Sequence, residues 1–564
     1  MNEIMSKKTF VLIALFIATM VGGFYLSGYI LLAWLKLPQV PLELGTYFKY
    51  FSLIDTPKVL PFATAIKVSG MLGFGVPLTV YLLGLFAVLK SKPQALHGSA
   101  RFATSRDLAT KKMFDASGDG IIVGKMNNKL VRLAGQQFVI LAAPTRSGKG
   151  VGIVIPNLLD YQHSMVVLDI KQENFDLTSG WRKSQGQEVF LFNPFAEDGR
   201  THRWNPLTYV SADKNFRISD LMSIAAMLYP DDSADQKFWV SQSRNAFLAF
   251  ALYLFEKYEY VTSMARQKPK LTVKPPQRTL GTIYRLSSGD GTPLKEFFSR
   301  LSGESYLSSD CKTAFANLLS QADDTFSSIM GTFKEPLNAW INPIVDAATS
   351  DDDFLLTDLR KKKMTIYIGI LPNKLAESRL IINLLFSQII NQNTKELPQN
   401  NSDLKFQCLL LMDEFTSIGK VDILANAVSY MAGYNIRLLP IIQSMAQLDA
   451  TYGKEQARTL ITNHALQILY APREQQDAND YSEMLGYTTI KKESITRGKE
   501  LSRSEREERR ALMLPQELKA MGNDKEVFVY EGLAHPVICD KIKYYQDKFF
   551  TQRLSKAVDI QKIY

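Results

Sequence analysis

Two places in this sequence combine residue types and spacing that predict chemistry, and the first is a lysine-containing turn. Residues 137–142 (QFVILA) form a short apolar run that predicts a buried strand, and residues 151–159 predict a helix. The turn between them ends in Gly148-Lys149-Gly150. A strand, a tight turn and a helix N-terminus make a phosphate cradle, because backbone N–H groups converge there and the lysine reaches the outer phosphates.

The turn departs from the usual phosphate-binding loop, GxxxxGK[ST], at two positions. Ala143 replaces the first glycine, and Gly150 stands where a hydroxyl side chain normally binds Mg²⁺. Taken alone, the turn is therefore also compatible with an ordinary glycine-containing turn. The predicted nucleotide-binding residues are Ala143, Pro144, Thr145, Arg146, Ser147, Gly148, Lys149, Gly150 and Val151.

The second place is an acidic pair at the end of an apolar run. Residues 406–412 are nearly all apolar, as expected of a parallel strand covered on both faces, and Asp413-Glu414 follow directly. Asp413 is the candidate Mg²⁺ ligand, and Glu414 is the candidate group that orients or deprotonates the attacking water. A solvated strand end is the alternative. Together with the Lys149 turn, the pair predicts an ATPase that uses ATP and Mg²⁺.

Six further apolar runs alternate with helical stretches such as 377–395. These runs are 165–170, 188–192, 364–370, 437–442, 465–470 and 526–530. The alternation predicts an α/β fold with a parallel sheet between helices, whose ligands bind at the carboxyl ends of the strands. Gln443 lies at such an end, where its amide is a candidate sensor of the γ-phosphate. A purely structural polar group is the equal alternative.

Two uncharged stretches near the N-terminus are long enough to cross a membrane. Residues 9–35 contain 27 uncharged residues, and residues 68–89 contain 22. At ~1.5 Å per residue, both helices exceed a hydrocarbon core of ~30 Å. We predict membrane spans at about 10–34 and 68–89, with a buried core helix as the alternative for each. Two spans put both termini on one side, and a site that needs ATP makes that side the cytoplasm.

The composition is typical of a globular protein of several domains. The chain has 564 residues, of which 46% are hydrophobic and 22% charged, and its formal net charge is +10. Three widely spaced cysteines and five histidines argue against a disulfide framework and a structural zinc site. The positive balance suits either a DNA-lined channel or a membrane-apposed protein.

In this order, the motifs resemble those of the type IV coupling proteins, the TraG/TraD-type membrane ATPases of conjugation and type IV secretion. The resemblance covers almost the whole chain. Besides the anchor, it rests on HGSARF (97–102), APTRSGKGVG (143–152), VIPNLL (154–159), LDIKQE (168–173), WNPL (204–207), LLLMDEF (409–415), IIQSMAQLDATYG (441–453) and RRALMLPQEL (509–518). The family itself uses GKG in place of GK[ST], which leaves Thr145 and Ser147 as candidate hydroxyl ligands of Mg²⁺.

This resemblance implies a RecA-like P-loop motor that forms a homo-hexameric ring at the bacterial inner membrane. Such a motor receives relaxase–DNA complexes or protein effectors and passes them, with single-stranded DNA, to type IV secretion channel components. The expected domains are a membrane anchor with a periplasmic loop (1–96), a nucleotide-binding domain in two parts (97–210 and 336–564) and an all-α domain (211–335).

The expected all-α domain shows helical periodicity where the strand pattern stops. Apolar residues recur at helical spacing in 218–229, residues 247–255 are almost wholly apolar, and helical patterning continues through 313–322. In the resembled family this lobe faces the cytoplasm and recruits substrate. Residues 266–278 carry five positive charges and no negative one, which favours a solvated loop over a loop that contacts DNA or a partner.

Two features near the C-terminus complete the expectations. Residues 491–510 contain eight basic and five acidic residues, which predicts a solvated linker or loop. Arg473, just past the strand at 465–470, is a candidate arginine finger for the nucleotide site of a neighbouring subunit.

The sequence favours a membrane-anchored ATPase that couples substrate to a type IV secretion channel. One alternative is a receptor platform for effector secretion with little motor activity. Another is a duplex-DNA translocase of the chromosome-segregation type. Such pumps usually carry more membrane spans and a winged-helix end, neither of which this sequence clearly shows.

Overall fold

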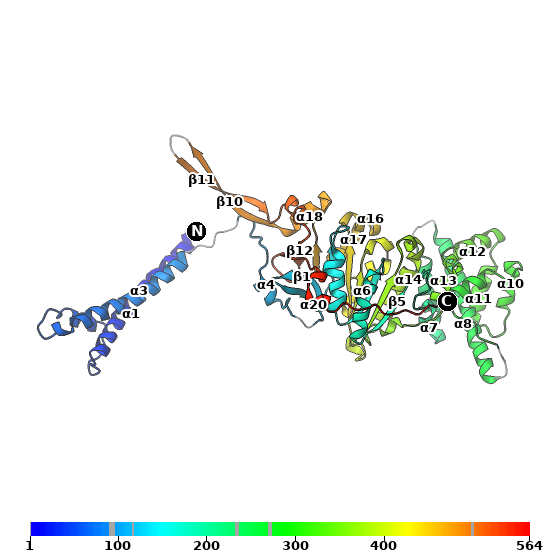
Figure 1. Ribbon diagram of the computed structural model, residues 1–564, viewed down its shortest axis with the longest axis horizontal. Helices are drawn as coiled ribbons and strands as arrows, with labels where there is room; N and C mark the ends of the chain where they lie inside the picture. The colour runs from blue at the N-terminus through cyan, green and yellow to red at the C-terminus, as the bar shows by residue number, and fades with distance from the viewer. Residues whose placement is uncertain are drawn as a thin grey trace. The chain divides into compact units, whose positions relative to one another are not determined.

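The computed structural model describes residues 2–89, 96–115, 118–231, 236–268, 273–497 and 501–563. The chain forms two compact units, Met1–Leu96 and His97–Tyr564. Helices make up the first unit, whereas a large mixed sheet with helices organises the second (Figure 1).

In the first unit, the long helices α1 (Asn2–Trp34) and α3 (Ala63–Leu89) pair with each other, and the short α2 (Thr46–Phe51) lies between them in sequence. The segments Leu12–Trp34 and Leu60–Phe86 are long and apolar enough to cross a membrane. Most of their side chains are exposed, which suits contact with lipid better than a place in a soluble core. Both predicted apolar helices are confirmed as helices.

Small residues set the distance between α1 and α3. Gly73 lies directly against Ser27, so that a Cβ atom at position 73 would come within 2.3 Å of the Ser27 Cα. Gly23 makes a similarly close approach to the ring of Phe74. Glycine and serine at a helix interface let two backbones approach closely, which is how helices in membranes gain packing contacts.

The second unit is built on one sheet of eleven strands in the order β2-β1-β13-β12-β9-β3-β8-β7-β4-β6-β5. These strands are β1 (Ile121–Met126), β2 (Lys129–Leu133), β3 (Val139–Ala142), β4 (Ser164–Asp169), β5 (Glu188–Phe192), β6 (Met364–Gly369), β7 (Cys408–Met412), β8 (Ile436–Ile442), β9 (Leu466–Leu469), β12 (Lys525–Tyr530) and β13 (Val537–Asp540). Seven neighbouring strands, from β9 to β5 in this order, are parallel.

Helices bury both faces of the parallel part, which explains why its strands are apolar without interruption. In β3, Val139 and Leu141 belong to the core on the side of α5 (Ile155–Asp160) and α6 (Glu173–Ser184). Ile140 and Ala142 belong to the core on the side of α14 (Leu375–Asn393). The alternation follows from the two-residue period of a strand. All eight predicted strands are present.

The expectation of a purely parallel sheet is wrong at one end. The predicted strand at 526–530 is β12, which pairs antiparallel with β9, and β13, β1 and β2 continue the sheet antiparallel beyond it. A short loop of residues 531–536 joins β12 to β13. So short a connection can only reverse the chain, because a parallel crossover needs a dozen or more residues.

The prediction of a linker or loop at 491–510 is also wrong, because the described residues of this stretch, 491–497 and 501–510, lie in a long hairpin of β10 (Tyr487–Arg497) and β11 (Leu501–Ala511) (Figure 1). Most residues of both strands are polar, so the sequence lacks the alternation of apolar and polar residues that usually predicts a strand. The base of the hairpin is held by a bridge between Ser99 and Thr488 and by the guanidinium of Arg509, 3.5 Å above the Tyr487 ring.

The remaining helices of this unit fall into two groups. Those flanking the sheet are α4 (Ser105–Thr110), α15 (Asp422–Ala427), α16 (Met445–Tyr452), α17 (Lys454–Thr462), α18 (Gln475–Leu485), α19 (Pro515–Lys519) and α20 (Lys548–Thr551). Those between β5 and β6 are α7 (Lys214–Leu228), α8 (Lys237–Gln267), α9 (Leu280–Ser287), α10 (Leu294–Ser302), α11 (Ser309–Leu319), α12 (Asp323–Leu337) and α13 (Pro343–Ala348).

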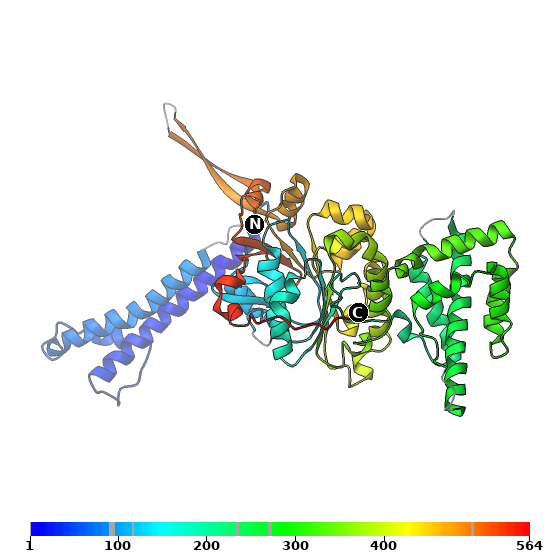
Figure 2. The same ribbon diagram turned by 45° about the vertical axis from the view of Figure 1, so that its right-hand side comes forward.

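The second group forms a helical lobe (Figure 2), and aromatic side chains pack between its helices. Phe250 of α8 contacts Phe298, Phe315 and Phe333 from three other helices of the lobe. The described residues between 211 and 335 contain no strand, as expected from their helical periodicity. Of the basic stretch at 266–278, residues 269–272 lie outside the described part of the chain.

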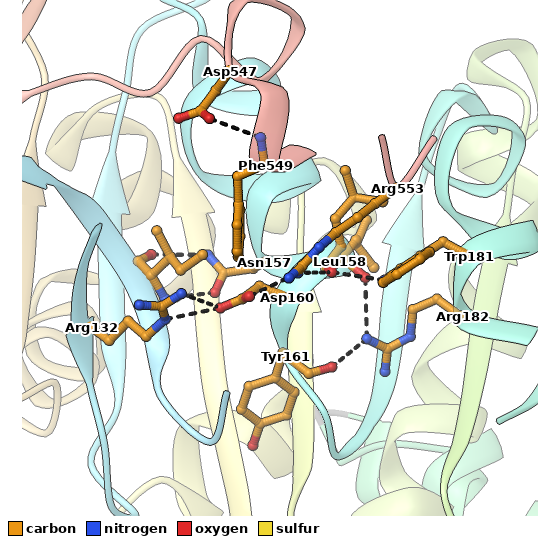
Figure 3. A network of polar contacts seen from close by, with 12 residues as sticks. Arg132, Asn157, Leu158, Asp160, Tyr161, Trp181, Arg182, Asp547, Phe549 and Arg553 are labelled. Atoms are coloured by element: carbon orange, nitrogen blue, oxygen red, sulfur yellow. Dashed lines mark hydrogen bonds and ion pairs between the residues drawn. The ribbon is translucent and has the colours of Figure 1, made fainter. Parts of the chain in front are cut away.

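Three arginines gather where α5 ends (Figure 3). Arg182 Nη1 donates to the carbonyl of Tyr161 at 2.6 Å. Asp160, 9% exposed, accepts 2.9 Å hydrogen bonds from Arg132 Nε and Arg553 Nη1. A helix C-terminus leaves carbonyls without partners, and cations stabilise it. Because Arg553 comes from the C-terminal segment, that segment braces the helix that follows the Lys149 turn.

The glycine contact between α1 and α3 can be tested by substitution. We expect Gly73→Leu to separate the helices, because any side chain at this position collides with the backbone of Ser27. In a background carrying Leu15→Cys and Gly84→Cys, a short thiol cross-linker should then join the helices several-fold less efficiently. Gly75→Leu is the control, since a Cβ there meets nothing within 4 Å. Equal yields for both variants would contradict this packing.

Candidate functional site

The candidate site lies where parallel strands end at one edge of the sheet. The Lys149 turn follows β3, Asp169 ends β4, Asp413 and Glu414 follow β7, and Gln443 follows β8. Strands β3, β8, β7 and β4 are consecutive neighbours and all parallel, so their carboxyl ends meet. The sheet therefore brings together residues that are up to about 300 positions apart in sequence.

Lys149 is the centre of this cluster. Its Nζ lies 3.0 Å from Asp413 Oδ1 and 2.5 Å from Glu414 Oε1. Its side chain is only 12% exposed, so these ion pairs are largely shielded from water. A lysine between two carboxylates forms a compact charged group of the kind that binds a metal-complexed phosphate.

Gln443 joins the acidic pair to the phosphate-binding turn. Its Nε2 donates to Glu414 Oε2 at 2.7 Å, and its Oε1 accepts from Thr145 Oγ1 at 3.1 Å. The amide thus contacts both parts of the predicted site. Gln443 therefore lies among the other predicted site residues, and its role as a sensor of the γ-phosphate stays a prediction.

The turn itself alternates in backbone handedness. Arg146 has φ +60° and Gly148 has φ +87°, both in the left-handed region. Alternation of this kind makes successive N–H groups converge into a concavity that binds anions. The helical turn η2 (Gly150–Val154) begins right after Lys149 and runs on into α5. The geometry is that of a phosphate cradle.

Arg473 lies beside the turn of its own chain. Its Nη2 donates to the carbonyl of Thr145 at 2.8 Å. The residue was predicted to act on a neighbouring subunit. In this structure it supports the local turn, and action on a neighbour stays a prediction.

A cleft of about 500 Å³ opens along this edge of the sheet. Lys149, Asp413, Glu414 and Gln443 all line it. Its remaining lining residues are Arg146, Gly148, Gly150, Val151, Ile155, Asp169, Ile170, Lys171, Glu173, Asn174, Leu177, Leu375, Ser417 and Tyr544. The lining of the cleft thus combines charged side chains with apolar ones and with one aromatic ring, that of Tyr544. Ligand pockets commonly have such a mixed lining.

Asp169, Asp413 and Glu414, three of the acidic side chains that line the cleft, differ in their pKa values. Burial raises the pKa of Asp413 despite its ion pair with Lys149. Burial would also raise the pKa of Glu414, but hydrogen bonds from Lys149 and Gln443 lower it overall. Burial raises the pKa of Asp169 to about 7, and the charge of Asp413 adds to this. At neutral pH Glu414 is thus the most readily ionised of the three.

Comparison with known proteins identifies the family. The family described as "Type IV secretory system Conjugative DNA transfer" matches residues 94–563, most of the chain. The chain belongs to this family. It is similar to Protein VirD4 of Rhizobium radiobacter, with 29% identity over 517 residues that cover 88% of this chain and 70% of that protein. It is also similar to the conjugal transfer protein TraG of Escherichia coli, with 27% identity over 470 residues, covering 76% and 72%.

Solved structures of a conjugative DNA-transfer coupling protein share the fold. Plasmid coupling protein TrwB in complex with the ATP analogue ADPNP superposes with a TM-score of 0.56 and 15% identity, covering 80% of this chain and 96% of TrwB. TrwB with ADP and Mg²⁺ gives a TM-score of 0.54 and 14% identity, covering 84% and 97%. These likenesses confirm the predicted RecA-like α/β fold.

The lysine and the two carboxylates in the cleft fit a magnesium nucleotide, and the adjoining turn carries two hydroxyl groups, those of Thr145 and Ser147. Ser147 Oγ is buried and has no hydrogen-bond partner among the described residues, whereas Thr145 Oγ1 already donates to Gln443. No group of three or more His, Cys, Asp or Glu side chains within the described ranges is placed to hold a metal by itself. Mg²⁺ commonly binds through one or two carboxylates together with substrate phosphates and water, and Asp413 offers one such carboxylate in the cleft.

Several residues at or beside the cleft were not among the site residues expected from the sequence, and Asp169, Tyr544 and Lys541 are three of them. Asp169 lies in the LDIKQE motif, at the end of a predicted strand, so its position was a usable signal. Tyr544 lines the cleft, and Lys541 Nζ lies 3.3 Å from the carbonyl of Ser147. Both residues come from the segment after β13, which passes close to the Lys149 turn. No local sequence pattern predicts this contact.

Asp169 gives a pH prediction. Its carboxylate accepts a 2.8 Å hydrogen bond from the backbone N–H of Phe175, and its pKa is about 7 in the folded protein against an ordinary 3.8. Between these pH values the folded state holds a proton that the unfolded state has lost. Ionisation of Asp169 thus makes the folded protein less stable as pH rises from about 4 to 7.

The asparagine in Asp169→Asn cannot ionise, so the variant lacks this pH-dependent loss of folding stability. We expect the melting temperature of the variant, relative to the unsubstituted protein, to increase as pH rises from 5 to 8. Thermal melting of the detergent-solubilised full chain at several pH values measures the difference. A difference that stays constant over this range would show that Asp169 does not titrate there.

Proposed function

We propose that this protein is a membrane-anchored ATPase that delivers single-stranded DNA, with its relaxase or protein effectors, to a type IV secretion channel. One observation carries the proposal: Lys149, Asp413, Glu414 and Gln443 converge in a single cleft at the edge of a RecA-like sheet. Family membership supports the transfer function, and the relatives are called a VirD4 protein and a conjugal transfer protein.

Each residue has a distinct role in the proposed site. The N–H groups of 146–150 and the Lys149 ammonium bind the phosphates, while Asp413 and the hydroxyl of Ser147 hold the metal. Glu414 accepts a proton from water or orients it, and Gln443 holds Glu414 in place. When bound, Mg²⁺ neutralises charge on the transferred phosphoryl group. The TrwB structures with ADPNP and with ADP and Mg²⁺ support this ligand choice.

Glu414 has a backbone conformation that suits a fixed catalytic group. Its φ of +57° lies in the left-handed region, which is uncommon for residues other than glycine. Such positions persist where the surroundings determine them and are found often at functional sites. Here the Lys149 ion pair and the Gln443 hydrogen bond hold the side chain.

Each proposed domain has its own role. Residues 1–96 anchor the protein in the bacterial inner membrane with two spans, both termini in the cytoplasm and the loop between the spans in the periplasm. Residues 97–210 and 336–564 form the motor, and the helical lobe at 211–335 recruits substrate. A homo-hexamer would put a neighbour beside each cleft. For Arg473 to act as an arginine finger there, its guanidinium must leave the Thr145 carbonyl.

Lys149→Ala tests the motor. We expect ATP hydrolysis to fall by about 100-fold or more, because the variant loses the cation that stabilises charge on the phosphates. Conjugative transfer should fall in parallel. Lys420→Ala is a matched control, because it also removes a lysine that pairs with an aspartate, Asp422, but at an exposed position.

Two outcomes would favour the alternatives. Transfer at a normal frequency by Lys149→Ala, despite lost hydrolysis, would indicate a receptor platform rather than a motor. Stimulation of hydrolysis by double-stranded DNA well above stimulation by single-stranded DNA would indicate a duplex translocase.

A further inference from the structure

Lys541 is a buried cation beside the phosphate-binding turn, and the proposed mechanism does not use it. It follows β13 directly and is 8% exposed. Its Nζ lies 3.3 Å from the carbonyl oxygen of Ser147 and 3.6 Å from the centre of the Tyr470 ring. Lys541 is not among the residues that line the cleft containing Lys149; it lines a separate pocket together with Asp524 and Asp540.

The contact with Ser147 bears on the direction of a phosphate-binding N–H group. In a trans peptide, the C=O and the following N–H point in opposite directions. A cation that holds the Ser147 carbonyl therefore fixes the N–H of Gly148 in the opposite direction, and Gly148 lines the cleft. Arg473 holds the Thr145 carbonyl, and the same argument applies there to the N–H of Arg146. Arg473 and Lys541 thus hold two peptide groups of the turn, Thr145–Arg146 and Ser147–Gly148.

The surroundings of Lys541 keep its ammonium group in place. The Tyr470 ring lies beneath it, and its backbone N–H donates to the carbonyl of Asp524 at 2.9 Å. Burial lowers the pKa of Lys541, whereas the charge of nearby Asp524 raises it. Glu526, fully buried, has its own pKa raised to about 8 by burial and is mostly uncharged at neutral pH. The Tyr470 hydroxyl also lies against Gly152 of η2, where a Cβ atom would come within 2.6 Å of it. The tyrosine therefore contacts both the lysine and the helix that begins after Lys149.

We propose that Lys541 is a positioning residue of the nucleotide site: by holding the Ser147 carbonyl, it prepares the N–H of Gly148 to bind phosphate. The inference rests on the proposed ATPase function. It assigns Lys541 no contact with the nucleotide. Its effect is to keep the turn in the binding conformation before ligand arrives, which lowers the cost of ordering the turn on binding.

Lys541→Met tests this inference, because methionine fills similar space without donating a hydrogen bond. A hydrogen bond from a charged donor corresponds to roughly tenfold or more in an equilibrium constant. We expect the Kd of a fluorescent ATP analogue with Mg²⁺ to rise about tenfold in the detergent-solubilised full chain. The KM for ATP should rise similarly, while kcat at saturating ATP stays within about threefold.

Two further variants separate positioning from general damage. Lys541→Arg keeps a cation and a donor and should recover most of the lost affinity. Lys543→Met is the matched control, because it removes an exposed lysine two residues away that pairs with Asp524, and its Kd should stay within twofold. Should Lys541→Met fail to fold, Lys541→Gln keeps a neutral donor and should still weaken binding by at least threefold.

These measurements separate failure of the Lys541 proposal from failure of the proposed ATPase function. If the unsubstituted protein binds no ATP analogue, the proposed nucleotide site is wrong. If it binds the analogue, and folded Lys541→Met or Lys541→Gln binds within twofold of it, the positioning role is wrong. An equal loss in the methionine and arginine variants would also overturn it, because the arginine retains the proposed contact.

Discussion

The candidate site depends on one geometric constraint, that neighbouring parallel strands end at the same edge of a sheet. Strands β3, β8, β7 and β4 are consecutive in the sheet although they are far apart in sequence. Because of this order, Lys149 lies within hydrogen-bonding distance of Asp413 and Glu414, and Gln443 within hydrogen-bonding distance of Glu414. The apolar residues on both faces of these strands fix their register, since a shift by one residue would turn core side chains to the wrong face.

The turn at Lys149 is supported from outside as much as from within the cleft. Arg473 and Lys541 hold its carbonyls, and the helix that follows it ends at Asp160, where Arg132 and Arg553 form ion pairs. Lys541 and Arg553 both come from the chain after β13, so this segment is part of the architecture of the candidate site. A phosphate cradle made of backbone groups needs this support, because its conformation includes left-handed residues that the turn would not hold by itself.

The sequence predicts much of this arrangement, and the failures have physical causes. Apolar runs located all eight expected strands, and the motif positions of Lys149 and Asp413 located the cleft. The direction of β12 was missed because an apolar run does not specify which neighbour it pairs with. The β10–β11 hairpin was missed because neither of its faces is apolar. Tyr544 and Lys541 lie at the site through tertiary contacts alone, which leave no local pattern in the sequence.

The central claim is that this cleft binds Mg-ATP and that Glu414 acts on the water that attacks it. The most direct measurement compares nucleotide binding with hydrolysis in Glu414→Gln, a nearly isosteric change that removes the carboxylate. The account predicts that the Kd of ATP stays within a few-fold of the unsubstituted protein, while hydrolysis falls by at least about 100-fold, as expected for loss of a general base. Hydrolysis at the unsubstituted rate by a variant that binds ATP normally would contradict it.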